Sequence, residues 1–169
     1  MNEKTIQELA ATENAVWEVI NAFSETEFNA VPFEGSWTPG QVAEHVRKSL
    51  KGMRKLLSGP AENTMRNPNE KTQALCKMFL NFDLKMQSPE MIIPADKSYD
   101  KQAMAAALRD ELTSIIELAK TQDLAETCLH FELPVFGALT RLELCHFIVV
   151  HTQRHIYQLK RILSAVHPV

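Results

Sequence analysis

Helical periodicity is the feature of this sequence that most constrains its fold. Apolar residues recur at intervals of three, four and seven positions in five segments, which is the spacing of one face of an α-helix. Strand signals are scarce, so the pattern predicts an all-α four-helix bundle with an additional short helix in a long connection. The predicted helices run from about Glu3 to Ser24, Pro39 to Leu57, Lys71 to Met86, Asp100 to Lys120, and Thr140 to Ser164.

Two of these helices begin with capping boxes. Thr38 and Gln41 form one, with Pro39 at the favoured first helical position, and Thr140 and Glu143 form the other. The segment QSPEMIIPADKSYD contains two prolines and is expected to be extended or irregular. The segment CLHFELPVFGAL contains a proline and a glycine, and it is expected to be a structured loop that can include a strand-like stretch.

The bulk composition narrows the classes of protein. A chain of 169 residues is most simply one domain, residues 1–169, large enough to fold around its own core. The formal charge of −3 provides no broad basic face, so we expect neither nucleic acid nor a membrane as a partner. Three irregularly spaced cysteines read as reduced thiols, and the N-terminus lacks a signal-peptide pattern. A cytoplasmic location is therefore expected.

Two histidines stand four positions apart in the last predicted helix. His151 and His155 would lie about 40° apart around the helix axis and about 6 Å apart along it. Both fall in the apolar stripe that includes Leu144, Ile148 and Ile162, which is expected to face the bundle interior. This spacing can supply two metal ligands from one rigid helix.

A third histidine faces inward from the second predicted helix. His45 shares a narrow sector with Val42, Ser49, Gly52 and Leu56, and the small Ser49 and Gly52 are expected to let a neighbouring helix come close. Three neutral imidazoles leave a fourth position open, as catalytic zinc sites usually do. The alternative is three buried histidines bonded to carbonyls and water, which is costly in one small core. The spacing favours the metal site.

Other polar residues near this stripe are weaker candidates. His146 lies about 140° from His151 around the helix and cannot share its site. His130, in the loop before the last helix, could reach the mouth of the site, although a surface role fits it better. Arg154 and Gln158 flank the inward stripe, where either could bind an anion or a metal-bound water; an outer salt bridge is the alternative for Arg154.

The segments GSWTPGQVAEHVRKSL and FGALTRLELCHFIVVHTQRHIYQL together resemble the DinB-like superfamily, which includes YfiT-type metal-dependent hydrolases. The resemblance covers most of the chain. It implies a four-helix bundle with up-down-down-up topology and a divalent metal held by His45, His151 and His155. Members of this family include S-transferases and isomerases that use low-molecular-weight thiols, and dimers are common among them.

These observations together lead to two competing expectations of function. The first is a metal-dependent enzyme that holds a divalent ion, with zinc or nickel expected, and acts on a small molecule. It would be a hydrolase or an S-transferase with a low-molecular-weight thiol as cosubstrate, and the sequence identifies no general base. The second is a non-catalytic binding or dimerisation module, including a homodimer, whose metal site is structural or vestigial.

Overall fold

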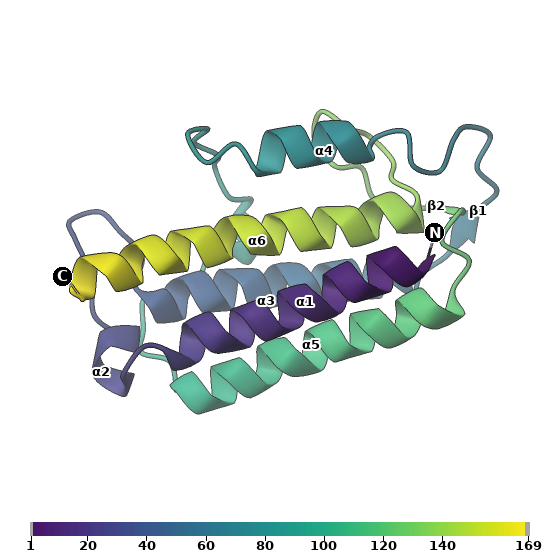
Figure 1. Cartoon of the computed structure of the whole chain (residues 1–169). Coiled ribbons are helices and arrows are strands. Elements are labelled where there is room, and N and C mark those ends of the chain that lie inside the picture. The colour runs from purple at the N-terminus through teal and green to yellow at the C-terminus, as the bar shows by residue number, and fades with distance from the viewer. Residues whose placement is uncertain (1, 168–169) are drawn as a thin grey trace.

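Four long helices form a bundle in the computed structural model, which describes residues 2–167 (Figure 1). The predicted all-α four-helix bundle is confirmed. Within these residues, no helix is both long and apolar enough to cross a membrane. The long helices are α1 (Asn2–Asn21), α3 (Pro39–Leu57), α5 (Lys101–Thr121) and α6 (Arg141–Val166).

The helices follow an up-down-down-up course. α1 packs against α5 and α6, and α3 packs against the same two helices, so α1 and α3 lie diagonally opposite each other. Figure 1 shows α3 and α5 running in the same direction, opposite to α1 and α6. Because α3 and α5 are parallel, the connection between them, residues 58–100, must return along the length of the bundle. The topology implied by the family resemblance is therefore confirmed.

The returning connection contains β1 (Ala61–Glu62), the short helix α4 (Thr72–Phe79) and the 3-10 helix η1 (Glu90–Ile92). α4 packs on α6 and buries Leu75 and Phe79. Together, α4 and the segment that follows it form an outer layer over one side of the bundle (Figure 1).

The expectation that this short helix extends to Met86 is wrong, because it ends at Phe79. Arg154 of α6 donates hydrogen bonds to the carbonyls of Phe79, Asn81 and Leu84, which a continuing helix would use internally. The exposed ring of Phe82 then stacks on Tyr157 rather than entering the core, with ring centroids 3.9 Å apart.

The first helix is also shorter than expected. α1 ends at Asn21, and Ser24 instead caps a separate four-residue helix, α2 (Glu25–Phe28). Ser24 and Glu27 form a capping box that the sequence analysis did not identify. A short polar segment satisfied by its own cap has little reason to continue the preceding helix.

The loop before α6 contains β2 (Thr127–Cys128), which pairs antiparallel with β1. The strand-like stretch thus lies at the start of this loop. Further along, Leu133 and Gly137 are bridged, and Val135 between them is exposed with φ of +75°. A β-branched residue rarely adopts this conformation, so the turn is strained.

A buried arginine joins the start of α6 to the end of α3. Arg141 donates hydrogen bonds to the carbonyls of Leu57 and Gly59, both at 3.0 Å. Its guanidinium also pairs with Glu126, which follows α5. These contacts hold three helix ends together at one end of the bundle.

The predicted capping box at the start of α6 does more than cap the helix. The carboxylate of Glu143 is fully buried and accepts hydrogen bonds from the backbone of Thr140 and Lys71 and from both terminal nitrogens of Arg66. Burial alone would raise the pKa of Glu143, but these donors outweigh it and hold the pKa below its ordinary value of 4.5. The interaction fastens the returning connection to α6.

We expect Glu143→Gln to lower the free energy of unfolding at pH 7 by roughly 3 kcal/mol, because an amide nitrogen would face hydrogen-bond donors and Arg66 would lose its counter-charge. The native carboxylate contributes stability above pH 4.5 that is lost as the pH falls through its lowered pKa. The difference in the free energy of unfolding between wild type and Glu143→Gln should therefore become smaller below that pH. Urea denaturation at pH 7 and pH 4 measures it.

Glu117→Gln is the matched control, since Glu117 pairs with Lys120 on the exposed surface of α5. Its effect should stay below about 0.5 kcal/mol. Equal stability of Glu143→Gln and wild type at pH 7 would contradict the role assigned to the buried carboxylate.

Candidate metal centre

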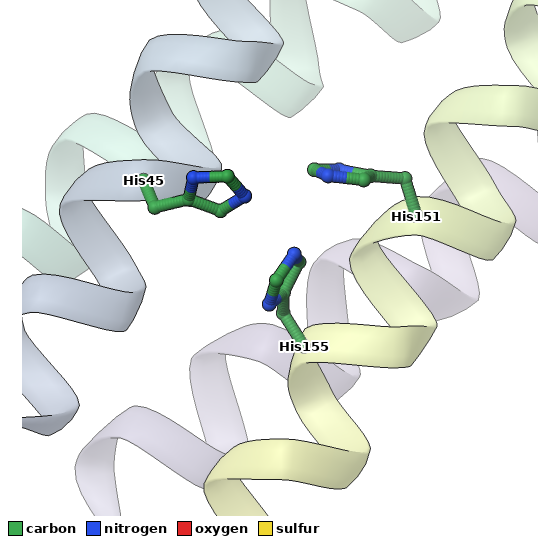
Figure 2. Close-up of side chains that lie close together, drawn as sticks. All are labelled: His45, His151 and His155. Atoms are coloured by element: carbon green, nitrogen blue, oxygen red, sulfur yellow. The ribbon is translucent and has the colours of Figure 1, made fainter. Parts of the chain in front are cut away.

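The three predicted histidines come together between α3 and α6. His45 projects from the second turn of α3, and His151 and His155 project from successive turns of α6 (Figure 2). One ring nitrogen from each lies within 4.8 Å of the others. The ring centroids are 5.4 Å apart for His45 and His151, 4.6 Å for His45 and His155, and 4.7 Å for His151 and His155.

Two of the rings are oriented by hydrogen bonds that leave their second nitrogen free. Nδ1 of His45 lies 3.0 Å from the carbonyl oxygen of Ile92, which can only accept a hydrogen bond, so Nδ1 carries the proton. Nδ1 of His155 lies 2.9 Å from Oε1 of Gln158 and donates to it in the same way. In both rings Nε2 is then the nitrogen with a lone pair, and outer hydrogen bonds of this kind are typical of metal-ligating histidines.

His151 is held by packing alone. Its ring contacts Phe147 and Phe79, with centroids 5.4 Å and 6.3 Å away, and it has no hydrogen-bond partner among residues 2–167. Neither ring nitrogen is fully buried, and the ring lines the cavity described below. An unpartnered ring nitrogen of His151 is therefore accessible to a metal ion.

The residues fit a divalent ion of the zinc class. Tetrahedral zinc with imidazole nitrogens at 2.0–2.1 Å places those nitrogens about 3.3 Å from one another. The observed upper separation of 4.8 Å exceeds this value by an amount that small ring rotations can close. Three neutral nitrogen donors also suit nickel, copper and iron.

Burial keeps the three imidazoles in the form that a metal requires. Burial lowers the pKa of His155 to about 3, and its neighbour His45 adds to the shift. Burial also lowers the pKa of His151 well below its ordinary value and that of His45 more modestly, the hydrogen bond to Ile92 opposing the latter shift. Neutral imidazoles at pH 7 present lone pairs without first losing a proton.

The histidines lie in the wall of a cavity of about 1030 Å³. It extends along α3 from His45 to Pro60, beneath α4, the segment 84–92 and the loop 129–135. The expectation that Gly52 admits a neighbouring helix is wrong. A Cβ atom at this position would meet nothing within 4 Å, because Gly52 lines the cavity and leaves it open.

The weaker candidates occupy other places. His146 points away from the cluster toward Glu8, with Nδ1 and the carboxylate 3.5 Å apart. His130 is exposed and lines the cavity beside Pro60, at the opposite end from His45. Arg154 is committed to three backbone carbonyls, to which its guanidinium donates hydrogen bonds. The Oε1 atom of Gln158 accepts a hydrogen bond from His155.

The cysteines do not take part. Burial raises the pKa of Cys145 to about 12 and that of Cys128 to about 11, so both remain protonated thiols. Three further groups at the site were not predicted from the sequence: the carbonyl of Ile92 and the rings of Phe79 and Phe147. No local sequence signal identifies them, because Ile92 and Phe79 reach the site through the packing of distant segments and Phe147 is an ordinary apolar residue of α6.

Comparisons with known proteins identify the family of this chain. The family model of the DinB superfamily matches residues 8–159, and the chain therefore belongs to the DinB superfamily. The uncharacterized protein YuaE of Bacillus subtilis (strain 168) is 26% identical over 158 residues, covering 89% of this chain and 91% of YuaE.

A solved structure shows the same fold. YfiT from Bacillus subtilis superimposes with a TM-score of 0.61 at 17% identity, covering 98% of this chain and 87% of YfiT. YfiT is described as a probable metal-dependent hydrolase with an unusual four-helix bundle topology. At this level of identity, the likeness establishes the fold.

We expect His45→Ala and His151→Ala to weaken zinc and nickel binding by more than about a hundredfold, since even outer-shell changes cost tenfold to a hundredfold. The measurement is metal content and metal titration of untagged protein. His146→Ala, on another face of α6, is the matched control and should retain the ion. Circular dichroism should show that the metal-free variants remain folded. Full metal content in His151→Ala would contradict the three-histidine site.

We expect Gln158→Leu to weaken metal binding about tenfold to a hundredfold, because it removes the acceptor that orients His155. Gln158→Glu keeps an acceptor and should restore most of the affinity. Gln153→Leu alters an exposed residue of the same helix and should have no effect. Unchanged affinity in Gln158→Leu would show that packing alone orients His155.

Proposed function

We propose that this protein is a metal-dependent enzyme that acts on a small molecule, with His45, His151 and His155 as the metal ligands. The observation that carries the proposal is the combination of three neutral imidazoles, turned toward one another, with a large cavity beside them. A purely structural site would have no need for such a cavity. The description of YfiT as a probable metal-dependent hydrolase supports the same class of function.

When bound, a divalent ion would supply Lewis-acid chemistry, polarising a substrate or lowering the pKa of a water or thiol. The residues of the chain orient the histidines and form their surroundings. His45 and His155 are held in one tautomer by Ile92 and Gln158, so their free nitrogens are oriented before an ion arrives. Phe79 and Phe147 place apolar rings next to His151.

The cavity favours transfer of a small thiol over hydrolysis. Hydrolysis usually uses a protein base to accept a proton from water, and among the described residues no Asp or Glu lines the cavity. His130 is too remote, since it lies beside Pro60, roughly 20 Å from His45 along α3. A thiol is far more acidic than water and needs no such base near neutral pH.

The test compares two reactions with metal-loaded wild type and His151→Ala. We expect conjugation of a small thiol to 1-chloro-2,4-dinitrobenzene at least about tenfold above background with wild type, and no enhancement with the variant. Hydrolysis of a 4-nitrophenyl ester is measured in parallel. His146→Ala should behave as wild type in both assays.

The outcomes separate the candidate functions. Ester hydrolysis without thiol transfer would support a hydrolase and would show that the preference for thiol transfer is wrong. Turnover that persists in His151→Ala would contradict metal-dependent catalysis. No turnover in either assay by fully metal-loaded protein, together with a metal-dependent rise in melting temperature, would favour a structural metal in a non-catalytic module.

A further inference from the structure

The charges around the cavity are strongly unbalanced. Within the described part of the chain, six basic side chains line it and no acidic side chain does. The whole chain has 21 acidic and 18 basic residues, so its composition does not account for the difference. Glu90 and Glu132 belong to neighbouring segments but lie outside the lining. The basic residues are Arg47, Lys48, Lys51, Lys55, Lys85 and Arg154.

Three of these cations are already satisfied by the protein. Arg47 forms a two-point ion pair with Glu44, at 2.7 and 2.9 Å. Lys48 donates to the carbonyl of Ile93 at 2.8 Å, and Arg154 is held by carbonyls after α4. These contacts explain the presence of three of the six basic side chains by their structural roles.

The other three cations have no such role. Lys51, Lys55 and Lys85 are exposed and have neither an ion-pair nor a hydrogen-bond partner for their ammonium groups among residues 2–167. Lys51 and Lys55 stand four residues apart on α3, so they project from the same side of the helix, one turn apart. They lie six and ten residues after His45, or about 9 and 15 Å along the helix axis.

The lining between these lysines and the histidines is mostly apolar, although Lys48 and Ser49 also contribute to it from α3. Gly52 contributes no side chain there and leaves the floor of the cavity open. The remaining surface is made largely by Met53, Leu56, Met78, Phe79, Phe131 and Phe147. A ligand that extends from the histidines toward Lys51 and Lys55 would contact mostly apolar surface along its length and ammonium groups at its other end.

We infer that the cavity binds an amphipathic organic anion. Its apolar body lies along Gly52 and Met53, and its negatively charged group lies at Lys51 and Lys55, about 9 and 15 Å from His45 along the axis of α3. The inference rests on the proposed function only in placing the reacting end of the molecule at the histidines. Neutral imidazoles do not offset the lysines, so the positive potential of the cavity favours an anion with or without metal.

The test is calorimetric titration with 1-decanesulfonate, because a sulfonate pairs with lysine but is a weak metal ligand. The comparison ligands are 1-decanol, which lacks the charge, and 1-butanesulfonate, which lacks the apolar length. We expect 1-decanesulfonate to bind both metal-loaded and metal-free protein, and to bind at least about tenfold more tightly than either comparison ligand.

Two variants locate the ligand. The double substitution Lys51→Gln with Lys55→Gln should weaken 1-decanesulfonate binding roughly tenfold and leave 1-decanol binding unchanged. Gly52→Phe should fill the open floor and weaken binding of both ten-carbon ligands more than about tenfold while metal content stays unchanged. The control, Lys160→Gln with Arg161→Gln, removes the same charge from an exposed face of α6 and should have no effect.

Several results would overturn the inference. These are 1-decanol binding as tightly as 1-decanesulfonate, unchanged affinity in the double lysine variant, or unchanged affinity in Gly52→Phe. Binding that requires metal and ignores the lysine substitutions would place the anion at the ion instead, which also contradicts it. If the enzyme assays fail while 1-decanesulfonate binds as expected, the proposed function is wrong and the ligand class stands.

Discussion

The hydrogen bonds from Arg141 to the carbonyls of Leu57, the last residue of α3, and of Gly59 just beyond it set the longitudinal register on which the histidine cluster depends. They place the start of α6 level with the end of α3, and the two helices run in opposite directions. His45 lies twelve residues before Leu57, and the position twelve residues after Arg141 is 153, midway between His151 and His155. Equal rise in both helices brings these positions to the same level, about 18 Å from the arginine.

The returning connection completes the site that this register creates. Its carbonyl at Ile92 orients His45, its Phe79 packs near His151, and Arg154 fixes its path one residue before His155. The same segment thus lines the cavity and orients His45. A four-helix bundle with three short hairpin loops would bring the helices together but would leave His45 without this outer support.

The sequence was sufficient for the features that depend on local spacing. The inward faces of α3 and α6, their capping boxes at Thr38 and Thr140, and the inward orientation of each histidine follow from helical geometry within single segments. The meeting of the histidines across α3 and α6 was expected from this shared orientation and from the family resemblance. Specific contacts between other distant segments could not be predicted. The end of α4 depends on Arg154, which lies about 75 residues beyond Phe79. The openness of Gly52 likewise depends on what covers α3 and not on its own neighbours.

The up-down-down-up course also affects how the chain folds. α1 does not pack beside α3, the next long helix. α6 packs on α1, α3 and the short helix α4, and not to a comparable extent on α5, the long helix before it. The two parallel partners α3 and α5 meet only after more than forty residues of connection. No long helix can therefore pack against the next long helix through a tight turn. The long connections must close before most of the stabilising contacts between helices can form. Folding should accordingly be slow for an all-helical chain of this length.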